Sequence, residues 1–237
     1  MAETFRENPF RLAFGLMRLP KNPDGSIDIP QVCEMTDRFI AAGGTYFDTA
    51  YVYDGGDSEK AFKAAVADRY PRDAWTLATK LNAVLGASDE QSAKAEFRTS
   101  LERTGAGFFD YYLLHAMQRT TFKKYDEYGL WDFVKEQKAK GLIRHWGFSF
   151  HADPDLLEEL LEKHPDAEFV QLQINYADWD NPGVASRRNW EICRAHGKPV
   201  MIMEPVKGGI LADPIPEVKA VFDASGADAP ENKTGSA

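Results

Sequence analysis

The sequence predicts an α/β fold of the (β/α)8 TIM-barrel type that is incomplete, with about seven strands present and the eighth strand and last helices missing. Short, nearly continuous apolar runs alternate with stretches of helical periodicity, a pattern typical of buried parallel strands and crossover helices. The polar residues that close six of these runs follow one another at intervals of 26 to 35 residues, each the length of one βα unit. They are Asp48, Lys80, His115, Ser149, Asn175 and Glu204. A doubly wound sheet needs no such regularity, and no G-x-G-x-x-G motif follows the first run, so a barrel is favoured.

Seven runs have the length and β-rich composition expected of buried strands. They are Leu12–Leu16, Thr45–Asp48, Trp75–Lys80, Asp110–His115, His145–Phe150, Phe169–Asn175 and Pro199–Glu204.

Capping residues and glycines predict where the intervening helices begin and end. The first expected helix has an apolar stripe of Val32, Met35, Phe39 and Ile40 and stops at Gly43-Gly44, and the second is capped by Ser58 with Glu59 in its first turn. Four more helices are expected from Ser88 to about Thr104, from Tyr125 to Lys140, from Pro154 onward, and from about Val184 to His196.

The end of the sequence departs from the barrel pattern. By the same spacing an eighth strand should end near position 234, yet the last fifteen residues contain no Val, Ile, Leu, Met, Cys or aromatic side chain. Such a composition is typical of disordered chain. We therefore expect residues 1–222 to form the barrel domain and residues 223–237 a disordered tail.

Composition narrows the class of protein. The chain has 237 residues and a formal net charge of −9, which argues against binding nucleic acid or an anionic membrane surface. No apolar run is long enough for a membrane span, and the first residues do not resemble a signal peptide. Two cysteines, Cys33 and Cys193, cannot build a disulfide framework or a cysteine metal site. We expect a cytoplasmic protein without a metal.

Three strand-end residues carry groups suited to acid–base chemistry. Asp48, Lys80 and His115 close successive strands, so a barrel would bring them to one mouth, and Tyr53 follows in the loop after Asp48. A neighbouring ammonium stabilises a phenolate, a carboxylate can hold that ammonium, and an imidazole can hydrogen-bond a carbonyl oxygen as charge builds on it. Together these groups suit protonation of a carbonyl that receives hydride.

Each residue also has a simpler structural explanation. Asp48 could cap the turn that follows it, Tyr53 could be a loop aromatic, Lys80 a solvated strand end and His115 a core histidine. The placement of all four at adjacent strand ends favours chemistry, although periodicity alone leaves the two interpretations about even.

Local sequences add a family resemblance. Phe47-Asp48-Thr49-Ala50-Tyr51-Val52-Tyr53 followed by Gly56-Asp57-Ser58-Glu59 closely resembles the F-D-T-A-x-x-Y…G-x-S-E segment of the aldo-keto reductases. Five further motifs agree in order and spacing, and the resemblance covers residues from about 10 to 222. They are Gly15–Pro20, Ala78–Lys80, Asp110–His115, Gly147–His151 and Glu204–Gly209.

The resemblance implies an oxidoreductase that reduces an aldehyde or ketone with hydride from NADPH. By this resemblance Tyr53 is the general acid, Lys80 and Asp48 adjust the pKa of Tyr53, and His115 orients the substrate carbonyl. The cofactor NADP(H) would contact Gly15, Met17, Asp48, Ser149, Gln171, Met203, Pro205, Val206 and Gly208. Of these, Ser149 and Gln171 match the family's positions for the nicotinamide carboxamide, and the loop from Pro205 to Gly209 matches the one that the pyrophosphate approaches. Where many members place a stacking tyrosine this chain has Met203, and the frequent asparagine beside the serine is Phe150.

Two functions remain open alongside a different barrel enzyme. One is NADP(H)-dependent reduction of a small carbonyl substrate, and the other is a weak or inactive barrel remnant that binds nucleotide or a protein partner. In the family, the eighth strand and the helix after it provide many of the contacts to adenosine and the 2′-phosphate. No segment of this sequence matches that strand or helix. The resemblance thus implies a C-terminally truncated member with weak cofactor binding and little preference for NADPH, and its unpaired strand edges would favour a homo-oligomer.

Overall fold

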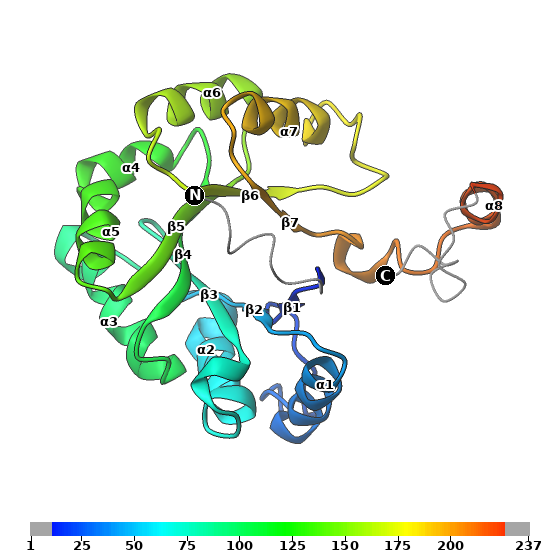
Figure 1. Cartoon of the computed structure of the whole chain (residues 1–237), viewed down its shortest axis with the longest axis horizontal. Helices are drawn as coiled ribbons and strands as arrows, with labels where there is room; N and C mark the ends of the chain where they lie inside the picture. Colours follow the sequence, from blue (N-terminus) through cyan, green and yellow to red (C-terminus); the bar gives the residue numbers. More distant parts are fainter. Residues whose placement is uncertain (1–10, 226–237) are drawn as a thin grey trace.

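A computed structural model describes residues 11–225 and confirms the predicted incomplete barrel. Seven parallel strands form one sheet in which each strand pairs with its neighbours in sequence. They are β1 (Phe14–Gly15), β2 (Tyr46–Asp48), β3 (Thr76–Leu81), β4 (Phe109–Met117), β5 (Ile143–Phe150), β6 (Phe169–Gln173) and β7 (Val200–Met203). The sheet curls with helices along its outer side (Figure 1). Within the described residues β1 and β7 each pair on one side only, so the curl stays open between them.

Helices connect successive strands, as the repeated βα pattern predicts. They are α1 (Ile29–Ala41), α2 (Asp57–Phe62), α3 (Glu90–Thr104), α4 (Phe122–Glu127), α5 (Leu130–Ala139), α6 (Pro154–Lys163), α7 (Ser186–Ala195) and α8 (Pro216–Ala224). Short helical turns add η1 (Tyr53–Gly56), η2 (Lys63–Ala67), η3 (Arg72–Ala74) and η4 (Lys207–Gly209). None of the described helices has both the length and the apolar character needed to cross a bilayer.

Side-chain capping differs from the sequence prediction at two helix starts. Asp89 rather than Ser88 caps α3, because its carboxylate accepts from Ser92 N while the Ser92 hydroxyl accepts from Asp89 N. Ser58 caps no helix. Its hydroxyl is buried and donates to the backbone oxygen of Leu16 at 2.8 Å, so this serine ties the loop after β1 to α2.

The helix predicted over Tyr125–Lys140 is two helices. Gly129 has φ 58°, a left-handed conformation that ends α4 and precedes α5. Because glycine adopts this conformation without steric penalty, it lets the chain change direction between two short helices.

Side chains alternate between the two faces of the curled sheet. The outer face packs a large apolar core under the helices, including Phe47, Leu77, Tyr112, Phe148 and Val170. The inner face holds a smaller apolar cluster of Ala78, Tyr111, Leu113 and Phe169, with Tyr46 and Met201 packed against it. Strand side chains repeat every two residues, so the next inward positions along these strands carry polar side chains. This alternation places the candidate site above a small apolar floor.

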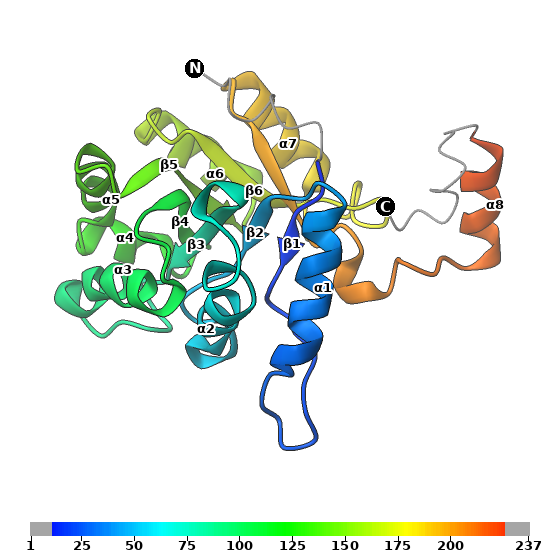
Figure 2. The same ribbon diagram turned by 60° about the horizontal axis from the view of Figure 1, so that its bottom comes forward.

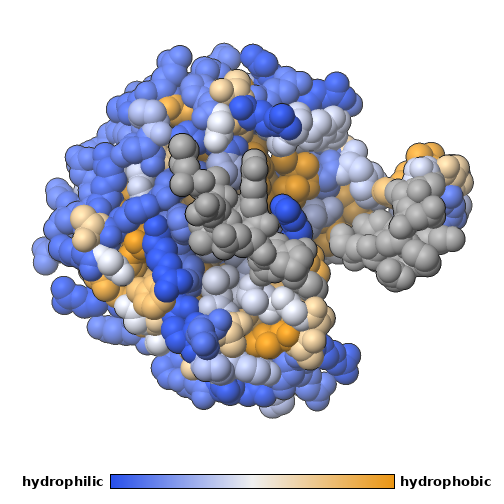
Figure 3. Space-filling view, viewed as in Figure 1, coloured by the Kyte–Doolittle hydropathy of each residue, from blue (hydrophilic) through white to orange (hydrophobic). Residues whose placement is uncertain are grey.

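The last helix, α8, projects away from the body of the molecule in both ribbon views (Figures 1 and 2). None of its residues is buried, and its surface is partly apolar where Figure 3 shows it in orange. The ring of Phe222 lies 5.2 Å, centroid to centroid, from that of Tyr176 in the loop after β6. Of the predicted tail, residues 223 and 224 belong to this helix, and residues 226–237 lie outside the described part.

Candidate active site

The structure brings the four predicted acid–base residues together at the carboxyl ends of β2 to β4. Asp48 ends β2, Lys80 lies one residue before the end of β3, and His115 lies two residues before the end of β4. Lys80 is two residues beyond Ala78 of the inner apolar cluster, and therefore shares its inward orientation. The fourth residue, Tyr53, starts the short helical turn that follows β2.

The Lys80 ammonium is the centre of the cluster. Its side chain is 1% exposed, and Nζ donates to Asp48 Oδ1 at 2.5 Å, to Thr49 O at 2.7 Å and to the Tyr53 hydroxyl at 3.4 Å. Burial alone would lower the pKa of Lys80, but the charges and hydrogen bonds of Asp48 and Tyr53 outweigh it, and the pKa is raised. Lys80 therefore stays a cation, with all its donors engaged, beside the phenol.

Backbone bonds and an unusual conformation hold Tyr53 in this position. Tyr51 N donates to Lys80 O at 3.1 Å, and Tyr53 N donates to Ala50 O at 3.1 Å. The next residue, Asp54, has φ 50°, a conformation that side-chain-bearing residues rarely adopt. The Tyr53 ring lies 5.5 Å from the His115 ring, edge to face, so the phenol stands between an ammonium and an imidazole.

His115 is a buried, neutral imidazole. Burial, with the nearby Lys80 ammonium, lowers the pKa of His115 well below its ordinary value. Its Nδ1 is a buried nitrogen without a hydrogen-bond partner in the described part of the chain. The Tyr125 hydroxyl donates to the backbone oxygen of His115 and so fixes the strand end. A neutral imidazole held in this way can offer one N–H to an incoming oxygen.

A local irregularity follows His115. Ala116 has φ 55°, and the pairing of β4 with β5 shifts between Leu114 and Met117. The Ala116 N–H donates to Ser149 Oγ at 2.7 Å. The bulge thus turns the strand end toward β5 and links His115 to a residue predicted to contact cofactor.

Ser149 and Gln171 are paired in register on β5 and β6. Gln171 Nε2 donates to Asp48 Oδ2 at 3.0 Å. The two oxygens of Asp48 thus accept from Lys80 and from Gln171, which connects the acid–base cluster to the predicted carboxamide position. Met203 ends β7 opposite Gln173, at the same rim of the sheet.

The predicted pyrophosphate loop follows β7 directly. It contains Pro205, Val206 and Gly208, and its glycine has φ 67°. Glu204, just before this loop, has φ 55° and forms an ion pair of 2.7 Å with Arg18. The segment after β7 therefore contacts the loop after β1. Gly15 and Met17 on that side are exposed, and a side chain added at Gly15 would meet nothing within 4 Å. The nine predicted cofactor residues therefore lie along one rim, with open space at Gly15.

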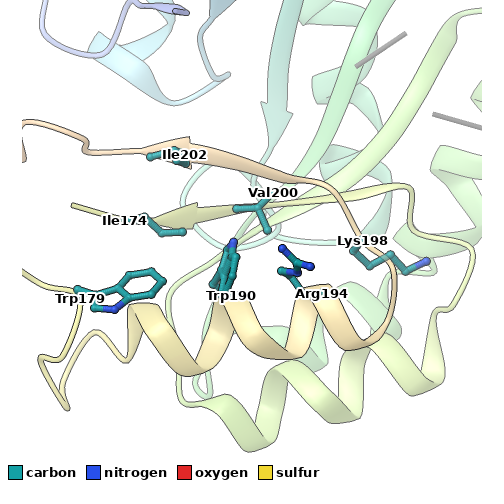
Figure 4. Close-up of a pocket in the computed structure, with 7 residues that line it drawn as sticks. All are labelled: Ile174, Trp179, Trp190, Arg194, Lys198, Val200 and Ile202. Carbon is teal, nitrogen blue, oxygen red and sulfur yellow. The ribbon is translucent and has the colours of Figure 1, made fainter. Parts of the chain in front are cut away.

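A separate cavity of about 310 Å³ lies on the opposite face of the sheet (Figure 4). Trp190 and Arg194 of α7 face Val200 and Ile202 of β7 across it. None of the four acid–base residues lines it. No group of three or more His, Cys, Asp or Glu side chains suited to a metal occurs in residues 11–225.

Sequence reasoning missed two features that support the site. One is the pair of buried carboxylates Glu59 and Glu96 behind Lys80; the motif drew attention to Glu59 only as a helix start. The other is the Arg18–Glu204 ion pair, whose members are 186 residues apart. A charged residue among apolar helix positions is the available signal for Glu96, but no local pattern predicts the distant pair.

Comparisons with known proteins point to one family. The sequence model of the Aldo/keto reductase family matches residues 11–228. The aldo-keto reductase ausK of Emericella nidulans is 29% identical over 110 residues, which cover 41% of this chain and 28% of that protein.

Solved structures give the same result for the fold. The holo form of aldo-keto reductase AKR11C1 from Bacillus halodurans matches with a TM-score of 0.65 and 26% identity, covering 87% of this chain and 66% of that one. An aldo/keto reductase from Brucella melitensis matches with a TM-score of 0.66 and 20% identity, covering 91% of this chain and 74% of that one. The chain thus spans less than two thirds of the first relative of each kind.

Proposed function

The chain belongs to the aldo/keto reductase family, and on that premise we propose that it reduces an aldehyde or ketone with hydride from NADPH, with Tyr53 as the general acid. One observation carries the proposal: a lysine 1% exposed, paired with Asp48, lies 3.4 Å from the Tyr53 hydroxyl beside a neutral His115. The match to the family model over residues 11–228 supports an oxidoreductase in general. The remnant interpretation is therefore not favoured.

The residues along the rim fit a nicotinamide cofactor. Members of the family generally use NAD(P)H, and the bound nicotinamide would supply the hydride that the carbonyl carbon accepts. Ser149 and Gln171 would hold its carboxamide, the Pro205–Gly209 loop its pyrophosphate, and Met17 and Met203 its apolar faces. Gly15 leaves open space at that rim, and Gly208 has the positive φ that lets backbone approach a ligand closely.

The protein's own residues would complete the reduction by moving a proton. The substrate oxygen would lie between the Tyr53 hydroxyl and the His115 N–H, so both donors face the atom on which negative charge develops. Tyr53 gives its proton to that oxygen as the carbon receives hydride, and the product is an alcohol. The Lys80 ammonium stabilises the phenolate left behind, Asp48 holds the ammonium, and Tyr53 recovers a proton from solvent.

The partner is a small carbonyl compound, and a cytoplasmic location belongs to the same proposal. Cys33 and Cys193 are both free thiols in the structure, which fits a reducing compartment. Self-association through the open edges of β1 and β7 is a further part of the proposal.

Replacement of Tyr53 by phenylalanine tests the assignment directly. We expect consumption of NADPH with a panel of aldehydes and ketones to fall by about 10²–10⁴-fold, the range for loss of a general acid. Nucleotide binding, followed by quenching of tryptophan fluorescence with NADPH and with NADH, should be nearly unchanged. Tyr128→Phe is the matched control, because its hydroxyl bonds Ser88 O outside the site. Equal turnover in Tyr53→Phe and the control would sink the assignment.

A further inference from the structure

A second polar cluster lies behind the acid–base residues, on the outer face of β3, and the proposed chemistry does not use it. Its members are Tyr51, Glu59, Thr79, Asn82, Glu96 and Arg103. Glu59 and Glu96 are 0% and 1% exposed, and they share one neighbouring guanidinium, that of Arg103. Two buried carboxylates with a single cation leave this cluster short of positive charge.

The two carboxylates are not equivalent. Glu59 Oε1 accepts from Thr79 Oγ1 at 2.7 Å, and its Oε2 faces Arg103 Nη1 at 3.4 Å. Glu96 Oε2 accepts from the Asn82 backbone N–H at 2.8 Å, but its Oε1 has no hydrogen-bond partner among the residues that the structure describes. Glu96 is therefore the buried acid that has one oxygen without a hydrogen bond and no direct ion pair among the described residues.

Glu96 lies between the loops that follow β2 and β3. A Cβ built on Gly86 would lie 2.1 Å from Glu96 Oε1 and 2.8 Å from the Tyr51 ring. The carboxyl group is thus in direct contact with the backbone of the loop after β3 and close to the ring that precedes Tyr53.

Arg103 links this cluster to the loop that carries Tyr53. Its Nη1 donates to Tyr51 O at 3.1 Å, and its guanidinium lies 4.4 Å from the centre of the Tyr51 ring. A Cβ built on Gly56 would lie 2.4 Å from the guanidinium carbon. Arg103 therefore contacts the segment 51–56 on both sides of Tyr53.

The charge state of Glu96 follows from its surroundings. The pKa of Glu96 is raised to about 8, chiefly by burial. The charge of Glu59 also raises this pKa, while the Asn82 N–H and the Arg103 guanidinium oppose the rise. The other titratable groups facing it are the phenols of Tyr112 and Tyr125, which are buried. Glu96 is thus mostly neutral below about pH 8 and mostly ionised above it.

We propose that Glu96 is a positioning residue whose ionisation draws the Arg103 guanidinium away from Tyr51 O and loosens the loop that carries Tyr53. A buried carboxylate without a partner is costlier than a carbonyl without one, so the guanidinium moves to the new charge. Alkaline pH would in this way reduce the proton donation by Tyr53 through a group outside the reacting cluster. The inference rests on the proposed function and adds its regulation by pH.

The test compares wild type with Glu96→Gln, which mimics the neutral acid, and with Glu102→Gln, an exposed position on the same helix. Carbonyl reduction by wild type and Glu102→Gln should fall about tenfold between pH 7 and pH 9, as expected when one group with a pKa near 8 must be protonated. In Glu96→Gln this fall should be absent. An equal fall in all three proteins would overturn the proposal.

A second measurement does not depend on activity. Hydrogen exchange of the segment 51–56, corrected for the chemical exchange rate at each pH, should speed up above pH 8 in wild type and not in Glu96→Gln. If no protein reduces any carbonyl, the proposed function fails while this comparison still decides the role of Glu96. If Glu96→Gln does not fold, carbon NMR of the glutamate side chains in wild type can follow the titration of Glu96 instead. A Glu96 resonance that titrates near pH 4.5 would overturn the proposal.

Discussion

Arg18 and Glu204 form an ion pair of 2.7 Å that joins the loop after the first strand to the loop after the last. The two side chains are 58% and 24% exposed, so water screens their attraction. Their positions matter more than their energy, because this contact crosses the open side of the sheet where strand pairing is absent in the described residues. The pair also flanks the proposed cofactor rim.

Arg18→Gln should therefore affect ligand binding more than stability. We expect the free energy of unfolding to fall by less than about 1 kcal/mol, as is usual for exposed pairs. Binding of NADPH should weaken several-fold, because the two loops would no longer be held together. Fluorescence titration and denaturant unfolding measure the two effects, and Arg188→Gln on the surface of α7 serves as the control. A large loss of stability with unchanged binding would contradict this account.

Lys80→Met should impair both folding and reduction. Removal of the ammonium leaves the Asp48 carboxylate with Gln171 as its remaining side-chain donor, and breaking a buried pair costs about 3–5 kcal/mol. Carbonyl reduction should fall by about 10²–10⁴-fold because the phenolate loses its counter-charge. Denaturant unfolding and steady-state rates are the measurements. A variant with wild-type turnover would show that the ammonium has no part in proton transfer.

His115 should make the protein less stable in mild acid. The pKa of His115 is well below 6.5 in the folded chain, whereas an unfolded histidine titrates near 6.5. Below that pH the unfolded chain binds the additional proton, so the free energy of unfolding falls, by up to about 1.4 kcal/mol per pH unit. His115→Gln should lack this share of the slope between pH 6.5 and pH 5. An identical slope in wild type and variant would show that the pKa of His115 does not differ between the folded and unfolded chain.

Two glycines provide a matched pair. A Cβ at Gly147 would lie 2.2 Å from the backbone oxygen of Phe169, while one at Gly15 would meet nothing within 4 Å. Gly147→Ala should cost about 1–3 kcal/mol through strain between β5 and β6, whereas Gly15→Ala should leave stability nearly unchanged. Gly15→Ala should instead weaken NADPH binding, since the methyl group would occupy open space at the proposed cofactor rim. Thermal unfolding and fluorescence titration separate these outcomes, and equal stability of the two variants would contradict the geometry.

The edges of β1 and β7 should promote self-association. Unpaired strand edges present backbone donors and acceptors to other chains, and Ile202 on β7 is 55% exposed. Sedimentation velocity should show a concentration-dependent increase in mass. A compact monomer with a high, cooperative melting transition would speak against this prediction.

The strand pattern was predictable because each run has a short-range signature, and the seven strands appear in the expected order. Lys80 and His115 could be assigned to one site from strand ends alone, since parallel strands present their carboxyl ends together. Helix boundaries were less predictable: Asp89 and Ser88 are both good caps, and only the Ser92 bond distinguishes them. The role of Ser58 depends on the distant Leu16 carbonyl, which no local pattern contains.

The projecting helix and the buried carboxylates lay beyond sequence reasoning for a related reason. α8 carries good helical residues, but its separation from the body is a matter of tertiary contacts. The partnerless oxygen of Glu96 results from how α3 packs against the loop after β3. Composition cannot show either.

The alternation of β3 between its two faces has a consequence for tolerance to mutation. Leu77 and Leu81 face the helices, and Ala78 and Lys80 face the barrel interior. A saturation library read out separately for cellular abundance and for turnover should thus show a two-residue rhythm. Substitutions at Leu77 and Leu81 would deplete the protein itself. At Lys80, conservative replacements would leave more of the protein in the cell but abolish its turnover. Substitutions that change activity and substitutions that change stability would therefore fall on opposite faces of the same strand.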